Sequence, residues 1–300
     1  MDAESIERAV ALAEEDPKRI VTVVGPTASG KTELAVSLAE RIGAEIVSID
    51  SVQVYRFFDI GSGKPSPEEL RRAPHHMIGV IDPLEPMDAA RHAEMARGLV
   101  SDILARNKRV VLCGGTFLWV KALVFGLAEA PPASEEIRAR HRAVAEEQGR
   151  RALHDVLGRV DTESAARLHP NDVVRVSRAL EVHELTGRPM SLWQREHAFK
   201  TPRYDARLVA IKRTPDELSR RIEARAREML DSGWVAEVRD LTSHGYGDAR
   251  AMGSVGYREV FAMLAGKLPE DELLGAIVRS TRVFARRQRT WLNHEPVTWV

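Results

Sequence analysis

Along the first 126 residues, short apolar runs alternate with longer segments in which apolar residues recur at helical spacing. The apolar runs predict buried strands at residues 19–24, 45–49, 77–81 and 109–113. Leu34, Leu38 and Ile42 mark a helix over residues 33–42, and a longer helix is predicted from about 89 to 106. Strands that alternate with helices in this way predict a parallel sheet with helices on both faces.

The pattern changes after residue 126. Up to about residue 202 the apolar positions follow helical periodicity, without a convincing strand, and prolines stand at both edges of the segment. Residues 207–211 return to strand character, and the remainder is mostly helical. We therefore expect an α/β core over residues 1–126 and 204–300, interrupted by an all-helical insertion subdomain over residues 127–203.

Composition narrows the function classes. The 44 basic and 44 acidic side chains cancel, so any site for nucleic acid must be a local patch. The single cysteine, Cys113, excludes an internal disulfide framework and a multi-cysteine zinc site, and its apolar neighbours predict a buried thiol. An acidic N-terminal segment and the lack of a membrane-length apolar run predict a cytoplasmic protein without a membrane partner.

One motif follows the first predicted strand directly. It fits the phosphate-loop pattern G-x-x-x-x-G-K-[ST] in full, between a strand and a helix, and consists of Gly25, Pro26, Thr27, Ala28, Ser29, Gly30, Lys31 and Thr32. Such a loop turns several backbone N–H groups toward one anion, with Lys31 on the outer phosphate oxygens and the Thr32 hydroxyl on Mg²⁺. The fold class is therefore a P-loop NTPase-like parallel sheet. ATP is the default ligand of this motif, but the loop would hold any diphosphate.

A polar segment follows the second predicted strand, at the edge where ligands bind in such sheets. Its Asp50 could help to hold Mg²⁺ or act as a general base beside the phosphate loop. It could equally cap a turn.

The motifs together resemble one family. The order GPTASGKT, SIDSVQVYRFFDIGSGKP, PHHMIGVIDPLEP, VLCGGTFLWVKALVFGL, HPNDVVRVSRALEVHELTGRPMS, RRIEARAREMLDSGWVAEV, VGYREV and TRVFARRQRTWL is similar to that of the tRNA dimethylallyltransferases, or tRNA isopentenyltransferases. The resemblance covers about nine-tenths of the chain, which makes it more specific than one motif.

The resemblance implies a reaction and its residues. Members transfer a dimethylallyl group from dimethylallyl diphosphate to N6 of the adenosine 3′ of the anticodon in tRNA. The phosphate loop would then hold the donor's diphosphate, Asp50 would be the general base, and either Arg221 or Arg225 would contact the diphosphate. The residues that would contact the tRNA anticodon stem-loop are Asp50, Ser51, Val52, Gln53, Thr116, Arg138, Asn171, Asp172, Val173, Val174 and Arg175.

A second candidate RNA contact comes from charge. No acidic residue occurs from 279 to 293, and Arg279, Arg282, Arg286 and Arg289 share one helix face. A stripe of one sign in a neutral protein favours phosphate-backbone contact, so the segment Arg286, Arg287, Gln288 and Arg289 is predicted to bind tRNA. The arginines of the insertion are matched by acids, so its RNA role depends on the resemblance.

Several positions depart from the family's usual pattern. They are Ser62-Gly63, Gly79, Met87-Asp88, Phe117 and Trp119. The adjacent His75 and His76 would point to opposite faces of a strand, so metal ligation is not expected. Trp193, Trp234 and Trp299 are predicted to pack in the core or between subdomains.

Three other functions compete with this interpretation. A P-loop small-molecule or nucleotide kinase would consume ATP. An adenylate prenyltransferase would use the same donor but would need neither the insertion nor the arginine stripe. A non-enzymatic P-loop switch or RNA-binding module would bind without turnover. The sequence favours the tRNA enzyme, acting as a monomer.

Overall fold

The computed structural model describes residues 3–300, which form two compact units. Residues up to Val124 together with Arg203–Val300 form an α/β unit, and Phe125–Pro202 form a helical unit. No helix of the described chain is both long and apolar enough to span a bilayer.

The α/β unit is built on one parallel sheet with the strand order β3-β2-β4-β1-β5-β6. The strands are β1 (Ile20–Val24), β2 (Ala44–Ile49), β3 (His75–His76), β4 (Arg109–Gly114), β5 (Ala206–Ala210) and β6 (Val297–Trp299). The predicted fold class is confirmed.

Helices account for most of the remaining chain. Those of the α/β unit are α1 (Ala3–Glu14), α2 (Lys31–Ile42), α3 (Pro67–Arg72), α4 (Ala89–Ala105), α5 (Phe117–Val124), α11 (Pro215–Asp231), α12 (Trp234–Ser243), α13 (Tyr257–Leu264) and α14 (Leu273–Leu292), with short 3₁₀ turns at Arg250–Gly253 and Glu270–Glu272. Those of the helical unit are α6 (Glu135–Glu147), α7 (Arg150–Val160), α8 (Thr162–Arg167), α9 (Val173–Thr186) and α10 (Met190–His197).

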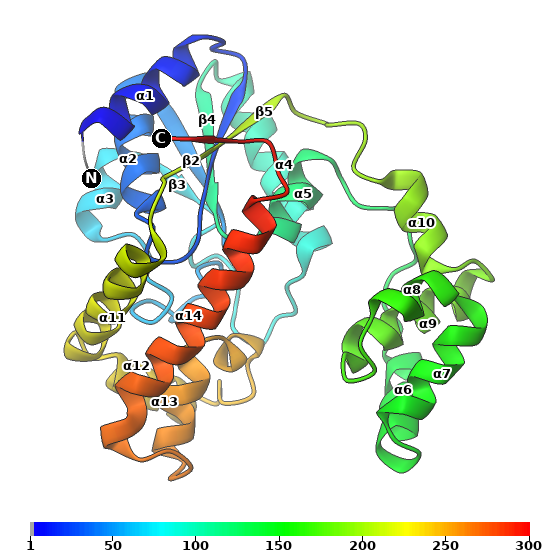
Figure 1. Ribbon diagram of the computed structural model, residues 1–300. Helices are drawn as coiled ribbons and strands as arrows, with labels where there is room; N and C mark the ends of the chain where they lie inside the picture. The colour runs from blue at the N-terminus through cyan, green and yellow to red at the C-terminus, as the bar shows by residue number, and fades with distance from the viewer. Residues whose placement is uncertain (1–2) are drawn as a thin grey trace. The chain divides into compact units, whose positions relative to one another are not determined.

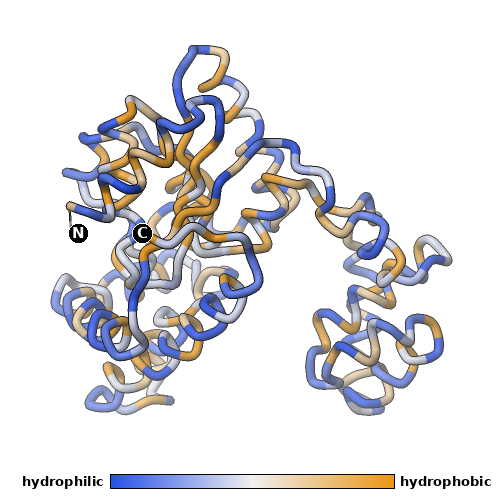
Figure 2. Tube along the Cα trace, turned by 45° about the horizontal axis from the view of Figure 1, so that its top comes forward, coloured by the Kyte–Doolittle hydropathy of each residue, from blue (hydrophilic) through white to orange (hydrophobic). Residues whose placement is uncertain are grey.

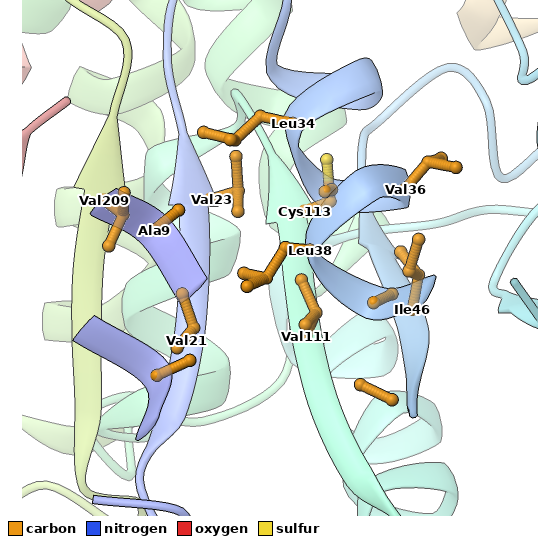
Figure 3. Packing of buried hydrophobic residues seen from close by; sticks show 14 of the residues in the cluster. Ala9, Val21, Val23, Leu34, Val36, Leu38, Ile46, Val111, Cys113 and Val209 are labelled. Carbon is orange, nitrogen blue, oxygen red and sulfur yellow. The ribbon is translucent and has the colours of Figure 1, made fainter. Parts of the chain in front are cut away.

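The sheet is buried on both faces, as its apolar sequence predicts. Every residue of β1 and β2 is buried. Helices α1 and α2 pack their apolar side chains on one face, where Leu34 and Leu38 meet Val21, Val23 and Val111 (Figure 3). Helices α4 and α5 lie on the other side of the sheet (Figure 1). Hydrophobic stretches follow the central strands, while blue and orange alternate along the helices (Figure 2).

The predicted strand at residues 77–81 is wrong. The strand is the preceding pair His75–His76, and the chain turns immediately afterwards because Met77 and Gly79 have φ angles of 64° and 60°. Ile81 keeps one isolated parallel bridge to Tyr55. The sequence pattern showed an apolar run but not these left-handed conformations.

The edge strand β6 was missed. It pairs with β5 through Val297, Thr298 and Trp299, which is too short a segment for a periodicity argument. Trp299 is 36% exposed at this edge, so its predicted core role is wrong. Trp234, in contrast, is buried as predicted.

The two aromatic residues that depart from the family's usual pattern each pack against another aromatic ring. Phe117 stacks on Trp291 of α14, with ring centroids 4.1 Å apart. Trp119 packs against the buried His92 of α4 at 4.6 Å. Phe117 therefore packs α5 against α14, and Trp119 packs α5 against α4, so both departures act through packing.

The helical unit has its own apolar core, which includes Leu153, Leu157, Val176 and Leu180. The buried carboxylate of Glu181 connects helices of this unit through ion pairs.

A buried histidine makes the stability of the α/β unit depend on pH. His92 is fully buried and its Nε2 lies 3.1 Å from the Ser48 carbonyl oxygen. Burial lowers its pKa to about 4. Between pH 6.5 and 4 the unfolded chain therefore binds a proton that the folded chain does not, and stability falls as the pH falls.

We expect His92→Phe to remove that part of the pH dependence, at most about 1.4 kcal/mol per pH unit. Urea unfolding of both proteins between pH 4.5 and 7.5 measures it. A stability difference between them that stays constant with pH would contradict the assignment to His92.

Candidate active site

The phosphate loop connects β1 to the start of α2. Ala28 and Gly30 have φ angles of 63° and 97°, which turn the chain so that the first N–H groups of α2 face outward. These groups have no partner inside the helix and form an anion site. Gly25 allows a close approach, because a Cβ there would lie 2.7 Å from the Ser29 hydroxyl oxygen and would force that side chain to move.

Side chains from far along the sequence hold the loop in this shape. The buried Gln288 of α14 accepts from Thr27 N–H (2.9 Å) and donates to the Gly115 carbonyl (2.9 Å). Arg221 Nε donates to the Ala28 carbonyl at 2.7 Å. Gln288 therefore braces the loop from inside the protein and does not project with the exposed arginines beside it.

Asp50 has two roles in the geometry. Its Oδ1 accepts from the backbone N–H groups of Val52 (2.9 Å) and Gln53 (3.2 Å), so it does cap a turn. Its Oδ2 has no hydrogen-bond partner within residues 3–300 and belongs to a side chain that lines a cavity. The capping and functional interpretations are compatible, because each uses a different oxygen.

This cavity, of about 280 Å³, brings together most of the site residues that the sequence predicted within the α/β unit. Those that line it are Thr27, Ala28, Lys31, Thr32, Asp50, Ser51, Val52, Gln53, Thr116, Arg225 and Gln288. A second cavity, of about 800 Å³, shares Ala28, Lys31, Thr32 and Arg225 with it and is also lined by Gly30 and Arg221. The phosphate loop therefore borders two adjoining cavities.

Two half-buried cations, Lys31 and Arg225, face these cavities. Burial lowers the pKa of Lys31, which the Asp50 carboxylate partly offsets, and burial likewise lowers the pKa of Arg225. Within the described chain neither cation forms an ion pair. Because a desolvated cation without a counter-ion is costly, the pair is suited to bind a strongly charged anion beside the phosphate loop.

The geometry also separates the two candidate arginines. Arg225 lines both cavities, whereas Arg221 donates to the phosphate-loop backbone. Arg225 is therefore the better placed of the two to contact a diphosphate.

Comparison with known proteins agrees with this arrangement. A model of the family described as IPP transferase matches residues 53–295. The chain belongs to the IPP transferase family.

Two relatives with the same name match this chain over nearly its whole length. The tRNA dimethylallyltransferase of Sorangium cellulosum is 61% identical over 284 residues, covering 95% of this chain and 90% of that protein. The tRNA dimethylallyltransferase of Geobacter sulfurreducens is 47% identical, covering 94% and 91%.

Solved structures of similar proteins share the fold of this chain. The tRNA isopentenylpyrophosphate transferase of Bacillus halodurans is 35% identical with a TM-score of 0.70, covering 94% of this chain and 89% of that one. A eukaryotic dimethylallyltransferase acting on tRNA has a TM-score of 0.77 at 24% identity, with 92% and 70% covered, and supports the fold.

Sequence reasoning missed the apolar wall of this IPP transferase site. The smaller cavity is also lined by Ile222, Ala226, Met229, Trp234, Ile277 and Phe284. The first three follow helical spacing on α11, a signal that the sequence contained but that did not show which cavity the face borders. A cavity lined by both cations and apolar side chains fits an amphipathic diphosphate.

The donor set fits Mg²⁺ only in company with a substrate. Thr32 and Asp50 are among the oxygen ligands that line the smaller cavity, and no group of three or more metal-binding His, Cys, Asp or Glu side chains occurs in residues 3–300. Mg²⁺ is commonly held by one or two protein oxygens plus phosphates and water. Thr32 would therefore share the ion with a bound diphosphate.

The remaining predicted RNA contacts lie outside these cavities. In the helical unit, Arg138 is paired with Glu181 at 3.0 Å, and Arg175 is paired with Asp172 at 3.1 Å. Val174, at the start of α9, is 81% exposed.

The arginine stripe lies on the far side of α14 from the smaller cavity. The cavity is lined by Ile277, Thr281, Phe284 and Gln288 of that helix. At about 100° per residue, Arg279 and Arg286 fall on the opposite face. Both are exposed and unpaired within the described residues, whereas Arg282 lies 3.6 Å from Glu223.

Arg225→Gln tests the contribution of this half-buried cation to anion binding. We expect about a tenfold to hundredfold weaker affinity for inorganic pyrophosphate with Mg²⁺, since a charge-assisted contact is lost. Isothermal titration calorimetry measures it, with Arg227→Gln on the exposed side of α11 as the control. Equal losses in the two variants would contradict a specific contact.

Proposed function

We propose that this protein transfers a dimethylallyl group from dimethylallyl diphosphate to N6 of the adenosine 3′ of the anticodon in tRNA, releasing diphosphate. The observation that carries the proposal is one cavity that joins the phosphate loop, two half-buried cations without an ion-pair partner in the described chain, an apolar wall and a carboxylate oxygen. The family membership and the names of the relatives support the same reaction.

On the donor side, the protein stabilises the leaving group. The bond between the allylic carbon and the diphosphate oxygen breaks, and the bonding electrons stay on diphosphate. The loop N–H groups, Lys31 and Arg225 would hold that negative charge. Mg²⁺, bound with Thr32, would supply further charge neutralisation. The apolar wall would surround the five-carbon chain and exclude water from the allylic cation.

On the acceptor side, a proton must leave the attacking amine. As N6 bonds to the allylic carbon it becomes positively charged, and Asp50 Oδ2 would accept its proton. Ser51, Gln53 and Thr116 would position the base, and Thr116 Oγ1 already accepts from Ser51 N–H at 3.3 Å. The adenine must leave its stack to enter the cavity, which costs less in a single-stranded loop than in a duplex.

The competing functions account for less of the site. A kinase would leave the apolar wall beside the phosphate loop without a purpose. An adenylate prenyltransferase would share the donor side but has no need of the helical unit, for which we propose a tRNA-binding role through Arg138 and Asn171–Arg175. The cytoplasmic location and the monomeric state remain predictions from the sequence.

The deciding experiment is mass spectrometry of an unmodified anticodon stem-loop RNA incubated with the protein, Mg²⁺ and dimethylallyl diphosphate. A mass gain of one isoprenyl unit on the adenosine beside the anticodon is expected. No gain on RNA, with ATP consumed or free adenylate prenylated instead, would refute the proposal.

Asp50→Asn separates base catalysis from turn capping. Asparagine keeps an oxygen for Val52 and Gln53 N–H but accepts a proton poorly, so we expect kcat to fall about 100-fold or more, with tRNA affinity nearly unchanged. Single-turnover kinetics and a tRNA binding assay measure the two effects. Asp50→Ala, which loses the cap as well, should also weaken binding, and full activity in Asp50→Asn would exclude this residue as the base.

Arg286→Ala tests the exposed face of α14. If this arginine contacts a tRNA phosphate, tRNA affinity should fall and the slope of log K against log salt should decrease by about one. Titrations at several salt concentrations measure the slope, with the exposed Arg8→Ala of α1 as the control. Unchanged affinity would identify the arginine face as an ordinary solvated surface.

A further inference from the structure

A loop that we call the bridging loop, residues 59–64, separates the two cavities. Gly61 and Ser62 line the smaller cavity. The loop's other residues, among them Gly63 and Lys64, line the larger one. The conformation of this loop therefore shapes both sides of the site.

One carboxylate holds the backbone of the bridging loop. Glu237 of α12 accepts hydrogen bonds from three successive N–H groups: Asp59 (2.9 Å), Ile60 (2.6 Å) and Gly61 (3.2 Å). The next N–H, of Ser62, donates to the Tyr257 hydroxyl at 3.1 Å. That hydroxyl in turn donates to Glu237 at 2.6 Å. Four consecutive loop amides are thus bound to two side chains from α12 and α13.

Side-chain packing also holds the bridging loop against α12. The Trp234 ring, at the start of α12, occupies the space beside Gly61 and Gly256 that side chains would fill. A Cβ on Gly61 would lie 1.9 Å from the indole nitrogen, and one on Gly256 would lie 2.1 Å from the ring. Both glycines are required by this close approach, which seats the bridging loop directly against α12.

The bridging loop in turn fixes a side chain in the smaller cavity. Gln53 Nε2 donates to the carbonyl oxygens of Ser62 (3.3 Å) and Gly63 (2.9 Å). Its Oε1 accepts from the Ser48 hydroxyl at 3.3 Å. Two carbonyl acceptors beside one end of the amide require that end to be the NH₂ group, which fixes the orientation of the amide.

We infer that Glu237 is a positioning residue that acts through the bridging loop on Gln53. With both Nε2 hydrogens used, the amide keeps only acceptor capacity, on Oε1. Gln53 therefore selects a base that presents an N–H donor and disfavours one that presents only acceptors. The inference rests on the proposed function for the identity of that base, an adenine with its exocyclic amine.

Glu237→Gln tests the first step without assuming any activity. The variant keeps the size of the side chain but replaces one acceptor oxygen by an NH₂ group, which faces the loop amides. Hydrogen exchange at residues 59–62 should become faster. Asp240→Asn, which removes the same charge from α12, is the matched control, because Asp240 makes no side-chain hydrogen bond to this loop among the described residues. Unchanged exchange in Glu237→Gln would overturn the inference.

Kinetics test the second step. Glu237→Gln should raise KM for the anticodon stem-loop about tenfold, the loss of one oriented hydrogen bond, with kcat within about twofold of the unaltered protein. In a Gln53→Ala background the same change should raise KM less than about twofold.

A purely structural role predicts otherwise. The two substitutions would then be additive, or kcat would fall together with thermal stability, and either result would overturn the relay to Gln53. If the unaltered protein transfers no prenyl group to RNA, the proposed function fails, while the exchange experiment still decides whether Glu237 holds the loop.

Discussion

The site depends on two cations that the fold partly desolvates without giving either an ion pair within the described residues. Lys31 follows the phosphate loop at the start of α2, and Arg225 reaches the same place from α11. Burial lowers the pKa of both groups, so holding them in the charged form has an electrostatic cost. A bound diphosphate relieves that cost, and the transition state, in which more charge develops on the diphosphate, relieves it further. The net charge of the protein is zero, so this is a local property.

The cations are useful only because the surrounding backbone is held rigidly. Gln288 and Arg221 fix the phosphate loop from positions far along the chain. Glu237 and Tyr257 do the same for the bridging loop. In both cases a side chain on a helix binds loop amides or carbonyls that no secondary structure would satisfy. The C-terminal helices therefore contribute to the site twice, as the source of Arg225 and the apolar wall and as supports for loops that belong to the first half of the chain.

Charge is distributed differently in the two units. In the helical unit the buried Glu181 binds both Arg138 and Arg178, which stabilises its packing and reduces their free positive charge. On α14, in contrast, Arg279 and Arg286 are exposed and unpaired among the described residues. They lie on the side of the helix away from the smaller cavity, so any RNA contact there would involve a different part of the RNA from the reacting base.

The sequence by itself determined the parallel α/β core, the helical segment and the phosphate loop, because these depend on local periodicity and on glycines at fixed spacing. It also placed Asp50 at the sheet edge where ligands bind, while Gln53 and Thr116 were identified by the resemblance to the family. It misplaced the strand at residues 77–81, where left-handed residues override the apolar pattern, and it missed β6, which only pairing with β5 defines. Only the tertiary structure showed that Gln288 points inward, that Arg225 lines both cavities whereas Arg221 lines the larger one and braces the phosphate loop, and that Glu237 holds the bridging loop. The physical reason is that each of these roles depends on contacts between segments far apart in sequence, which neither periodicity nor spacing records.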